Sequence, residues 1–175
     1  MIDGRPKIVL TRRWPAAVEA RMAELGDVEL NESDQPLSAD ALATALATAD
    51  IVCPTVTDAL PAALFQGEIR TRLLANFGVG FNHIDIAAAQ AAGVQIANTP
   101  GVMTEATAEI ALALLLMSAR RTGEGERHLR EGAWSGWSPT HMLSTQVTGK
   151  TLGIVGMGRI GTHFARQAHH GLGMR

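Results

Sequence analysis

Several absences restrict what this 175-residue chain can be. It has a single cysteine, so no disulfide can form within the chain, which fits a reducing cytoplasm. Its formal net charge of −2 gives no basic footprint, so no nucleic-acid partner is predicted. The longest apolar run, residues 110–117, is far too short to span a bilayer, so no membrane association is predicted. The polar first seven residues do not resemble a signal peptide.

Cysteine and histidine often act as catalytic residues or metal ligands, but their positions in this sequence indicate no such site. Cys53 ends an apolar run and precedes Pro54, which predicts a buried, unreactive thiol, because no neighbouring base is implied. The histidines lie at positions 83, 128, 141, 163, 169 and 170, and no two of them have a convincing metal-ligand spacing. The sequence therefore predicts neither a catalytic thiol nor a metal site.

Hydrophobic residues make up 46% of the chain, enough for a core, and in the first half they fall in short runs. The runs that predict strands cover residues 7–11, 28–30, 51–53, 72–77 and 94–97. Ser38, Asp58 and Asp85 are expected to cap the helices between them, and Gly93 to end one. Strands that alternate with helices predict a parallel sheet, so residues 1–98 are expected to form one α/β domain.

A long helix is predicted next, from about Thr104 to Arg121. Its middle, residues 110–117, is apolar all round, which predicts burial between layers or domains. The following segment, residues 122–146, contains four glycines and two tryptophans and is too long for a plain linker. We expect it to be an arm or loop that packs against another element or another subunit.

A glycine motif dominates the end of the chain. The apolar run 152–155 predicts a strand, residues 162–170 predict a helix, and Gly156, Gly158 and Gly161 lie between them. Strand, glycine turn and helix are the context of a dinucleotide-binding fingerprint. The first glycine allows the sharp turn, the second lets backbone approach a pyrophosphate, and the third lets helix and strand pack closely. The alternative is a glycine-rich turn in an ordinary α/β unit.

Four motifs in a fixed order carry a family resemblance. They are Asn76-Phe-Gly-Val-Gly-Phe-Asn-His-Ile-Asp85, Ala92–Gly101, Thr104–Glu109 and Gly156-Met-Gly-Arg-Ile-Gly161. Together they resemble the D-isomer-specific 2-hydroxyacid dehydrogenases. The pair Trp134 and Trp137 is similar to the glyoxylate/hydroxypyruvate reductase branch. The resemblance implies a flavodoxin-like parallel-sheet substrate domain, an interdomain helix, a dimerisation arm and a Rossmann domain. It also implies hydride transfer between NAD or NADP and a small 2-keto acid.

The resemblance also implies roles for individual residues. The amides of Val79 and Gly80 would hold the substrate carboxylate, although a tight turn without a ligand would explain that loop equally on spacing alone. Thr107 would contact the cofactor. The backbone amides of Arg159 and Ile160, with Gly156, Gly158 and Gly161, would meet the pyrophosphate. Trp137 would reach the partner subunit's active site or pack on the dimer interface.

The chain departs from the family pattern in one large respect. The family's catalytic Arg, Glu and His map onto no residue here, so no catalytic residue is assigned. No Asp or Glu follows Glu131, so the acidic residue expected on the cofactor ribose is missing as well. His83 lies beside the substrate loop, where a surface or capping role is expected. The sequence leaves open which keto acid is used and whether the cofactor is NAD or NADP.

The expected organisation is therefore a substrate domain, an interdomain helix, an arm and the first βα unit of an incomplete Rossmann domain. The boundaries are 1–98, 99–121, 122–149 and 150–175. A homodimer is expected through residues 104–146. One alternative is a non-catalytic partner that dimerises with a full-length paralogue. Another is a module that binds keto acids through the 77–80 loop alone.

A polypeptide of these 175 residues is expected to show no NAD(P)H-dependent reduction of glyoxylate or hydroxypyruvate, because it contains neither the proton donor nor the polarising cation. Absorbance of NADH and NADPH would be followed with pure protein. Turnover above the rate without protein would show that the catalytic residues have been assigned wrongly.

Overall fold

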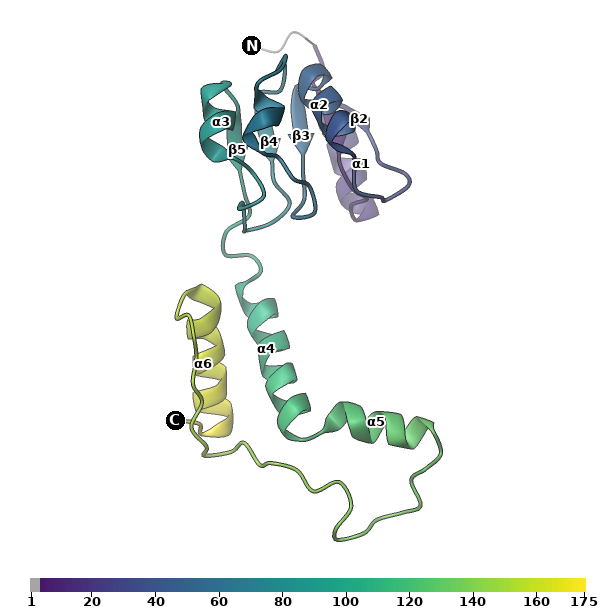
Figure 1. Ribbon diagram of the computed structural model, residues 1–175, viewed down its shortest axis with the longest axis vertical. Coiled ribbons are helices and arrows are strands. Elements are labelled where there is room, and N and C mark those ends of the chain that lie inside the picture. Colours follow the sequence, from purple (N-terminus) through teal and green to yellow (C-terminus); the bar gives the residue numbers. More distant parts are fainter. Residues whose placement is uncertain (1–3) are drawn as a thin grey trace. The chain divides into compact units, whose positions relative to one another are not determined.

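The computed structural model describes residues 4–175, which divide into two compact units (Figure 1). Unit 1 extends to Pro100, and unit 2 comprises Gly101–Arg175. No helix in the described residues is long and apolar enough to cross a membrane.

Unit 1 is built around one parallel five-stranded sheet (Figure 1). The strands are β1 (Lys7–Leu10), β2 (Asp27–Glu29), β3 (Ile51–Cys53), β4 (Leu73–Ala75) and β5 (Gln95–Ala97). The helices are α1 (Ala16–Leu25), α2 (Ala39–Thr48), the short 3₁₀ helix η1 (Ala62–Phe65) and α3 (Ile86–Ala91). The strand order is β2-β1-β3-β4-β5, which is the flavodoxin-like order. The predicted fold class is confirmed.

The core of unit 1 occupies both faces of the sheet. Val9 and Val52 face a large cluster that includes Leu46 of α2, whereas Leu10 and Cys53 face a smaller one. Successive residues of a strand point to opposite faces, so a sheet covered on both sides needs continuous apolar strands. Cys53 is fully buried, and burial raises the pKa of its thiol to about 12, in agreement with the predicted unreactive cysteine.

Two of the three predicted helix caps are present. The side chain of Ser38 accepts a hydrogen bond from the N–H of Ala41, and that of Asp85 accepts one from the N–H of Ala88. The prediction for Asp58 was wrong, because η1 begins after Pro61 and Asp58 bonds elsewhere. Its carboxylate accepts hydrogen bonds from Thr11, which follows β1, and from Thr55, which lies in the segment after β3.

Unit 2 contains the helices α4 (Thr104–Ala119), α5 (Thr122–Arg130) and α6 (Arg159–Leu172). The predicted helix to Arg121 ends two residues early, because Arg121 adopts the left-handed conformation with φ of 55°. The segment expected to be an arm or loop begins with the helix α5. The sequence did not indicate this helix, because the glycines at positions 123 and 125 disfavour helical structure.

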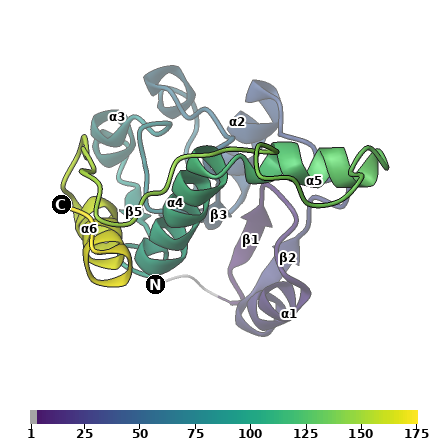
Figure 2. The same cartoon turned by 90° about the horizontal axis from the view of Figure 1, so that it is seen from below.

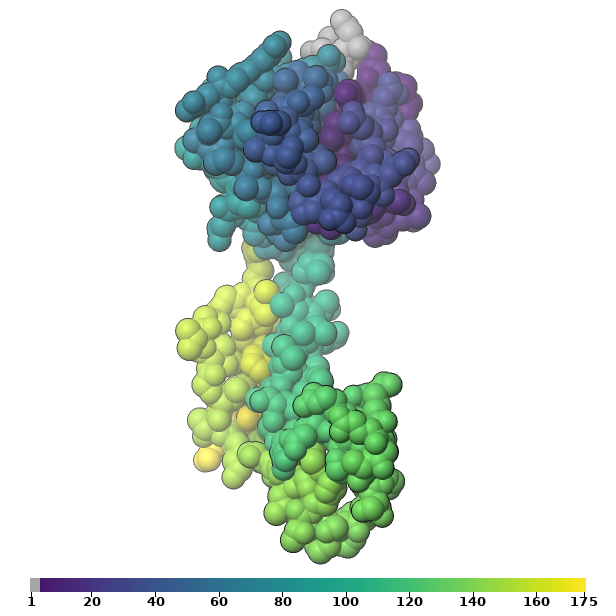
Figure 3. All heavy atoms as spheres, turned by 45° about the vertical axis from the view of Figure 1, so that its right-hand side comes forward, coloured from purple at the N-terminus to yellow at the C-terminus, as the bar shows by residue number. Residues whose placement is uncertain are grey.

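Only one side of α4 is covered within residues 4–175. α4 packs against α6, and Figures 2 and 3 both show the two helices side by side. Leu115 and Leu116 contact the cluster formed by Val147, Ala168 and Met174. On the remainder of α4 the apolar side chains are exposed, namely Ile110 (62%), Leu114 (59%) and Met117 (45%). Within unit 2, the predicted burial of the helix is found only on the side that faces α6.

The apolar run 152–155 forms no strand in the described chain, contrary to the prediction. Its start nevertheless pairs with Arg175. The N–H of Leu152 donates to the carbonyl of Arg175 (2.8 Å), and the N–H of Arg175 donates to the carbonyl of Lys150 (2.9 Å). Arg175 thus bonds to residues 150 and 152, which flank residue 151, and this is the hydrogen-bond pattern of two parallel strands. A single such pair is too short to count as a strand.

Leu74→Ala is expected to destabilise unit 1 by about 2–5 kcal/mol, because Leu74 is fully buried and truncation leaves a cavity. Urea unfolding followed by the amide signals of β1 and β3 would measure the loss. Leu25→Ala is the matched control, since Leu25 is 53% exposed on α1 and its truncation should cost less than about 1 kcal/mol. Equal effects of the two substitutions would contradict the assignment of the core.

Candidate functional site at the carboxyl ends of the strands

One group of polar side chains in unit 1 lies at the carboxyl ends of the strands, among them Thr11, Asp58 and Asn76. Because all five strands are parallel, the segments that follow β1, β3, β4 and β5 leave the sheet at the same edge. β1 connects to β2 on one side and has β3 on the other, which makes the β1–β3 boundary the topological switch point. Ligands of open α/β sheets bind in the crevice at such a point.

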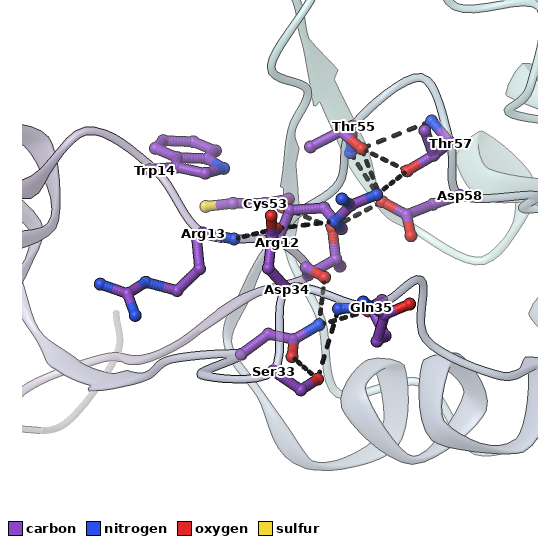
Figure 4. Close-up of polar contacts among 12 residues, drawn as sticks. Arg12, Arg13, Trp14, Ser33, Asp34, Gln35, Cys53, Thr55, Thr57 and Asp58 are labelled. Carbon is purple, nitrogen blue, oxygen red and sulfur yellow. Dashed lines mark hydrogen bonds and ion pairs between the residues drawn. The ribbon is translucent and has the colours of Figure 1, made fainter.

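Asp58 organises the segment after β3 (Figure 4). Its Oδ2 accepts from the hydroxyl of Thr11 at 2.5 Å and from the N–H of Thr55 at 2.7 Å. The side chain is buried, and its Oδ1 has no partner among the described residues. Asp58 thereby ties the end of β1 to the loop after β3.

Arg12 is drawn next to the same loop in Figure 4. Its guanidinium donates to Asp34 at 2.9 Å and to the hydroxyl of Thr57 at 3.2 Å. The bond from Arg12, together with one from the N–H of Arg13, lowers the pKa of Asp34. The charge of Arg12 is thus already paired, so Arg12 is not a free cation for an anionic ligand.

The loop after β4 has an unusual division of its backbone groups. The side-chain amide of Asn76 donates to the carbonyls of Gly78 (3.1 Å) and Gly80 (2.9 Å). The side-chain amide of Asn98, which follows β5, donates to the carbonyl of Val79 (2.8 Å). All three consecutive carbonyls of the loop are therefore bound by protein donors.

The N–H groups of the same loop are different. No acceptor within residues 4–175 is assigned to the N–H of Val79 or of Gly80. Both residues are exposed. Successive unpaired N–H groups form a concave site for an anion, so the loop can bind a carboxylate through its backbone.

His83 contacts the side chain of Asn76. Its Nε2 lies 3.0 Å from Oδ1 of Asn76. Desolvation lowers the pKa of His83, and the charge of Asp58 opposes this shift. The side chain of His83 thus contacts the amide that donates to the loop carbonyls.

The glycine turn in unit 2 gives each glycine a distinct environment. Gly156 has a φ of 95°, which a residue with a side chain rarely adopts. A Cβ on Gly161 would lie 2.1 Å from the carbonyl oxygen of Gly156. A Cβ on Gly158 would meet nothing within 4 Å. The first and third glycines are therefore required by the turn itself, and the second is not.

A groove of about 540 Å³ lies at the start of α6. It is lined by Thr104, Met157, Gly158, Arg159, Thr162, His163 and Arg166. The first bond assigned at this end of α6 runs from the N–H of Thr162 to the carbonyl of Gly158 at 2.9 Å. The N–H groups of Arg159 and Ile160 precede it and have no partner within the helix. With two arginines, this groove suits a phosphate.

Thr107 lies one turn along α4 from Thr104 and is exposed. Its hydroxyl donates to the carbonyl of Met103 at 2.7 Å. It is not among the residues that line the groove. The groove thus brings together Gly158 and Arg159 of the predicted residues, with Thr107 nearby on the neighbouring helix.

Comparison with known proteins agrees with this architecture. The model of the D-isomer specific 2-hydroxyacid dehydrogenase catalytic domain matches residues 8–169. A glyoxylate reductase from Korarchaeum cryptofilum is 39% identical over 172 residues, which cover 98% of this chain and 52% of the relative. The crystal structure of a D-isomer specific 2-hydroxyacid dehydrogenase from Polaromonas has a TM-score of 0.90 at 38% identity, covering 98% of this chain and 54% of that one.

A further solved relative was crystallised with ligands. It is an NADPH-dependent glyoxylate/hydroxypyruvate reductase from Sinorhizobium meliloti in complex with NADP and malonate. Its identity is 30% and its TM-score 0.75, and the match covers 95% of this chain and 51% of that one. The chain thus spans about half the length of the relatives it matches.

The fold defines a flavodoxin-like α/β domain followed by a helical unit with a glycine turn. The chain belongs to the D-isomer specific 2-hydroxyacid dehydrogenase family, because the family model covers most of its length.

Sequence reasoning missed the side chains that shape the loop after β4. Asn98 directly follows the predicted strand 94–97, and Asn76 lies near the end of the predicted strand 72–77, which was the available signal. Polar residues at the carboxyl ends of neighbouring parallel strands lie close together. The partners of Asp58 could not be found this way, because Thr11 is 47 residues away in the sequence.

Gly161→Ala is expected to destabilise the contact of α6 with the glycine turn by about 1–3 kcal/mol, because the new methyl group overlaps a backbone carbonyl. Hydrogen exchange of α6 amides would report the change. Gly153→Ala, whose methyl group would meet nothing within 4 Å, should leave the exchange unchanged. Unaltered exchange in Gly161→Ala would contradict the close approach at this position.

Proposed function

We propose that these residues belong to an NAD(P)H-dependent oxidoreductase that reduces a small 2-keto acid of the glyoxylate or hydroxypyruvate type. The names of the relatives support this proposal, since they include glyoxylate reductases and a glycerate dehydrogenase. The observation that carries it is the loop at residues 78–80, whose carbonyls are filled and whose N–H groups at Val79 and Gly80 are free among the described residues.

The loop would hold the carboxylate of the keto acid. Two backbone N–H donors fix the carboxylate and thereby fix the neighbouring carbonyl carbon, where a hydride must arrive. A carboxylate held by charge-assisted bonds to N–H groups needs no cationic side chain from this segment. The paired state of Arg12 is consistent with that arrangement.

The groove at the start of α6 fits the pyrophosphate of a dinucleotide. Open space at Gly158 is what a close approach of the phosphates requires, and the N–H groups of Arg159 and Ile160 lie at the positive end of the helix. Gly156 and Gly161 shape the turn, and Thr107 would contact the cofactor from α4. When bound, NADH or NADPH supplies the hydride, and the choice between them is not made by these residues.

Residues 104–146 would form the interface of a homodimer. This part of the proposal is supported by exposed apolar side chains, which are unfavourable in water and are common at subunit interfaces. They include Ile110, Leu114 and Leu129 on α4 and α5, and Trp137, which is 84% exposed. The single buried cysteine favours a reducing compartment such as the cytoplasm.

Gly80→Ala tests the carboxylate site. Glyoxylate would be titrated into the 175-residue chain while the amide signals of Val79 and Gly80 are followed by NMR. The unchanged chain should show saturable shifts at both positions, and Gly80→Ala should bind about tenfold more weakly or worse, because the methyl group enters the path of the anion.

Gly67→Ala is the matched control for this experiment. A methyl group at either glycine would meet nothing within 4 Å, so neither substitution should disturb the fold. Only Gly80 belongs to the loop. If Gly80→Ala binds glyoxylate like the unchanged chain, or if the two amide signals do not move, the carboxylate site is wrong.

A further inference from the structure

Among the side chains that hold the loop at residues 78–80, that of Asn76 makes contacts on two sides. The Nδ2 group of Asn76 donates to two carbonyls of the loop, those of Gly78 and Gly80. The Oδ1 atom of the same side chain faces Nε2 of His83 at 3.0 Å. The imidazole, the amide and the loop are therefore connected in series.

The orientation of this amide follows from its partners. An Asn side chain rotated by 180° would place Oδ1 against two carbonyl oxygens, where three acceptors would meet without a proton. Oδ1 must therefore point to His83, and Nε2 of His83 must carry a hydrogen to donate to it. The tautomer of His83 and the orientation of Asn76 fix each other.

We propose that His83 is a positioning residue of the carboxylate site, which acts on the Val79 and Gly80 amides through Asn76. This inference rests on the proposed function and names the residue that holds the binding loop in shape. Without the Nε2–H donor, Asn76 can rotate or leave the loop. The carbonyl of Gly80 then loses its donor, while that of Gly78 keeps only the N–H of Thr99 at 3.1 Å, and the N–H groups between them are held less firmly.

The structure gives His83 no free donor for direct contact through Nε2, because that atom is engaged with Asn76. The backbone of His83 is fixed as well, since its carbonyl accepts from the N–H of Leu60 at 2.8 Å. The side chain is half-buried. Its place is thus behind the loop, supported by the segment that follows β3.

His83→Leu and His83→Gln form the test, with glyoxylate as the probe and the full 175-residue chain as the sample. His83→Leu removes the donor and should weaken the response of the Val79 and Gly80 amides about five- to tenfold. His83→Gln places an amide donor at a similar reach and should restore most of the affinity. Glycolaldehyde, which lacks the carboxylate, controls for non-specific shifts.

The outcomes separate this inference from the function on which it rests. If the Val79 and Gly80 amide signals of the unchanged chain do not respond to glyoxylate, the proposed carboxylate site is wrong. If the unchanged chain and His83→Leu respond equally, only the role proposed for His83 is wrong. Equal weakening in both variants, with the amide signals of β1 and β4 undisturbed, would assign the imidazole a direct role and overturn the positioning role.

A measurement on the unchanged chain keeps the inference testable if a variant does not fold. The ¹⁵N signals of the His83 imidazole should show the Nε2–H tautomer in the neutral form, and the Nδ1–H tautomer would overturn the inference. Affinity for glyoxylate should also change less than about twofold as pH rises through the pKa of His83, because Nε2 keeps its hydrogen in both states. A large loss of affinity on deprotonation would indicate a direct charge effect, with Asp58 as the charge that acts on His83.

Discussion

The need to satisfy every buried backbone group explains how unit 1 makes a binding surface. Within the sheet, neighbouring strands satisfy one another. Beyond the strand ends, side chains take over. The carboxylate of Asp58 accepts an N–H group, and the amides of Asn76 and Asn98 donate to three carbonyls. Since protein donors fill the three carbonyls of the loop, the N–H groups of Val79 and Gly80 are the backbone groups left without a partner among the described residues.

The glycine turn of unit 2 shows the same separation between what the fold needs and what a ligand needs. Gly156 and Gly161 are required by backbone conformation and by a close carbonyl. Gly158 satisfies no such requirement, since a methyl group there would meet open space. A small residue that the fold does not demand is understood most simply through a ligand that approaches its backbone. The three glycines of one motif thus have two different physical causes.

Local patterns predicted the strands, the parallel sheet and two helix caps, because apolar runs and capping residues such as Ser38 and Asp85 depend on neighbours in the sequence. The flavodoxin-like order came from the family resemblance. Tertiary contacts explain the failures. Asp58 serves Thr11 rather than η1, and an apolar helix such as α4 does not reveal from its sequence which face a neighbour covers. The position of Asn98 after a predicted strand indicated the edge of the sheet where it lies, but not its partner, since Asn98 and Val79 meet only after β4 and β5 have paired.

Both candidate sites would bind their ligands through backbone N–H groups, and this has a consequence for specificity. Backbone donors are present whatever side chain occupies Val79, Arg159 or Ile160, so substitutions at those positions need not remove them. The side chains that aim the donors are therefore the sensitive elements. In unit 1 these are Asn98, which donates to the carbonyl of Val79, and Asn76, which His83 contacts at 3.0 Å. On the role proposed for His83, a substitution there would alter the affinity for a carboxylate although His83 does not contact the ligand. The affinity of a site built from main-chain atoms would then depend on a side chain outside it.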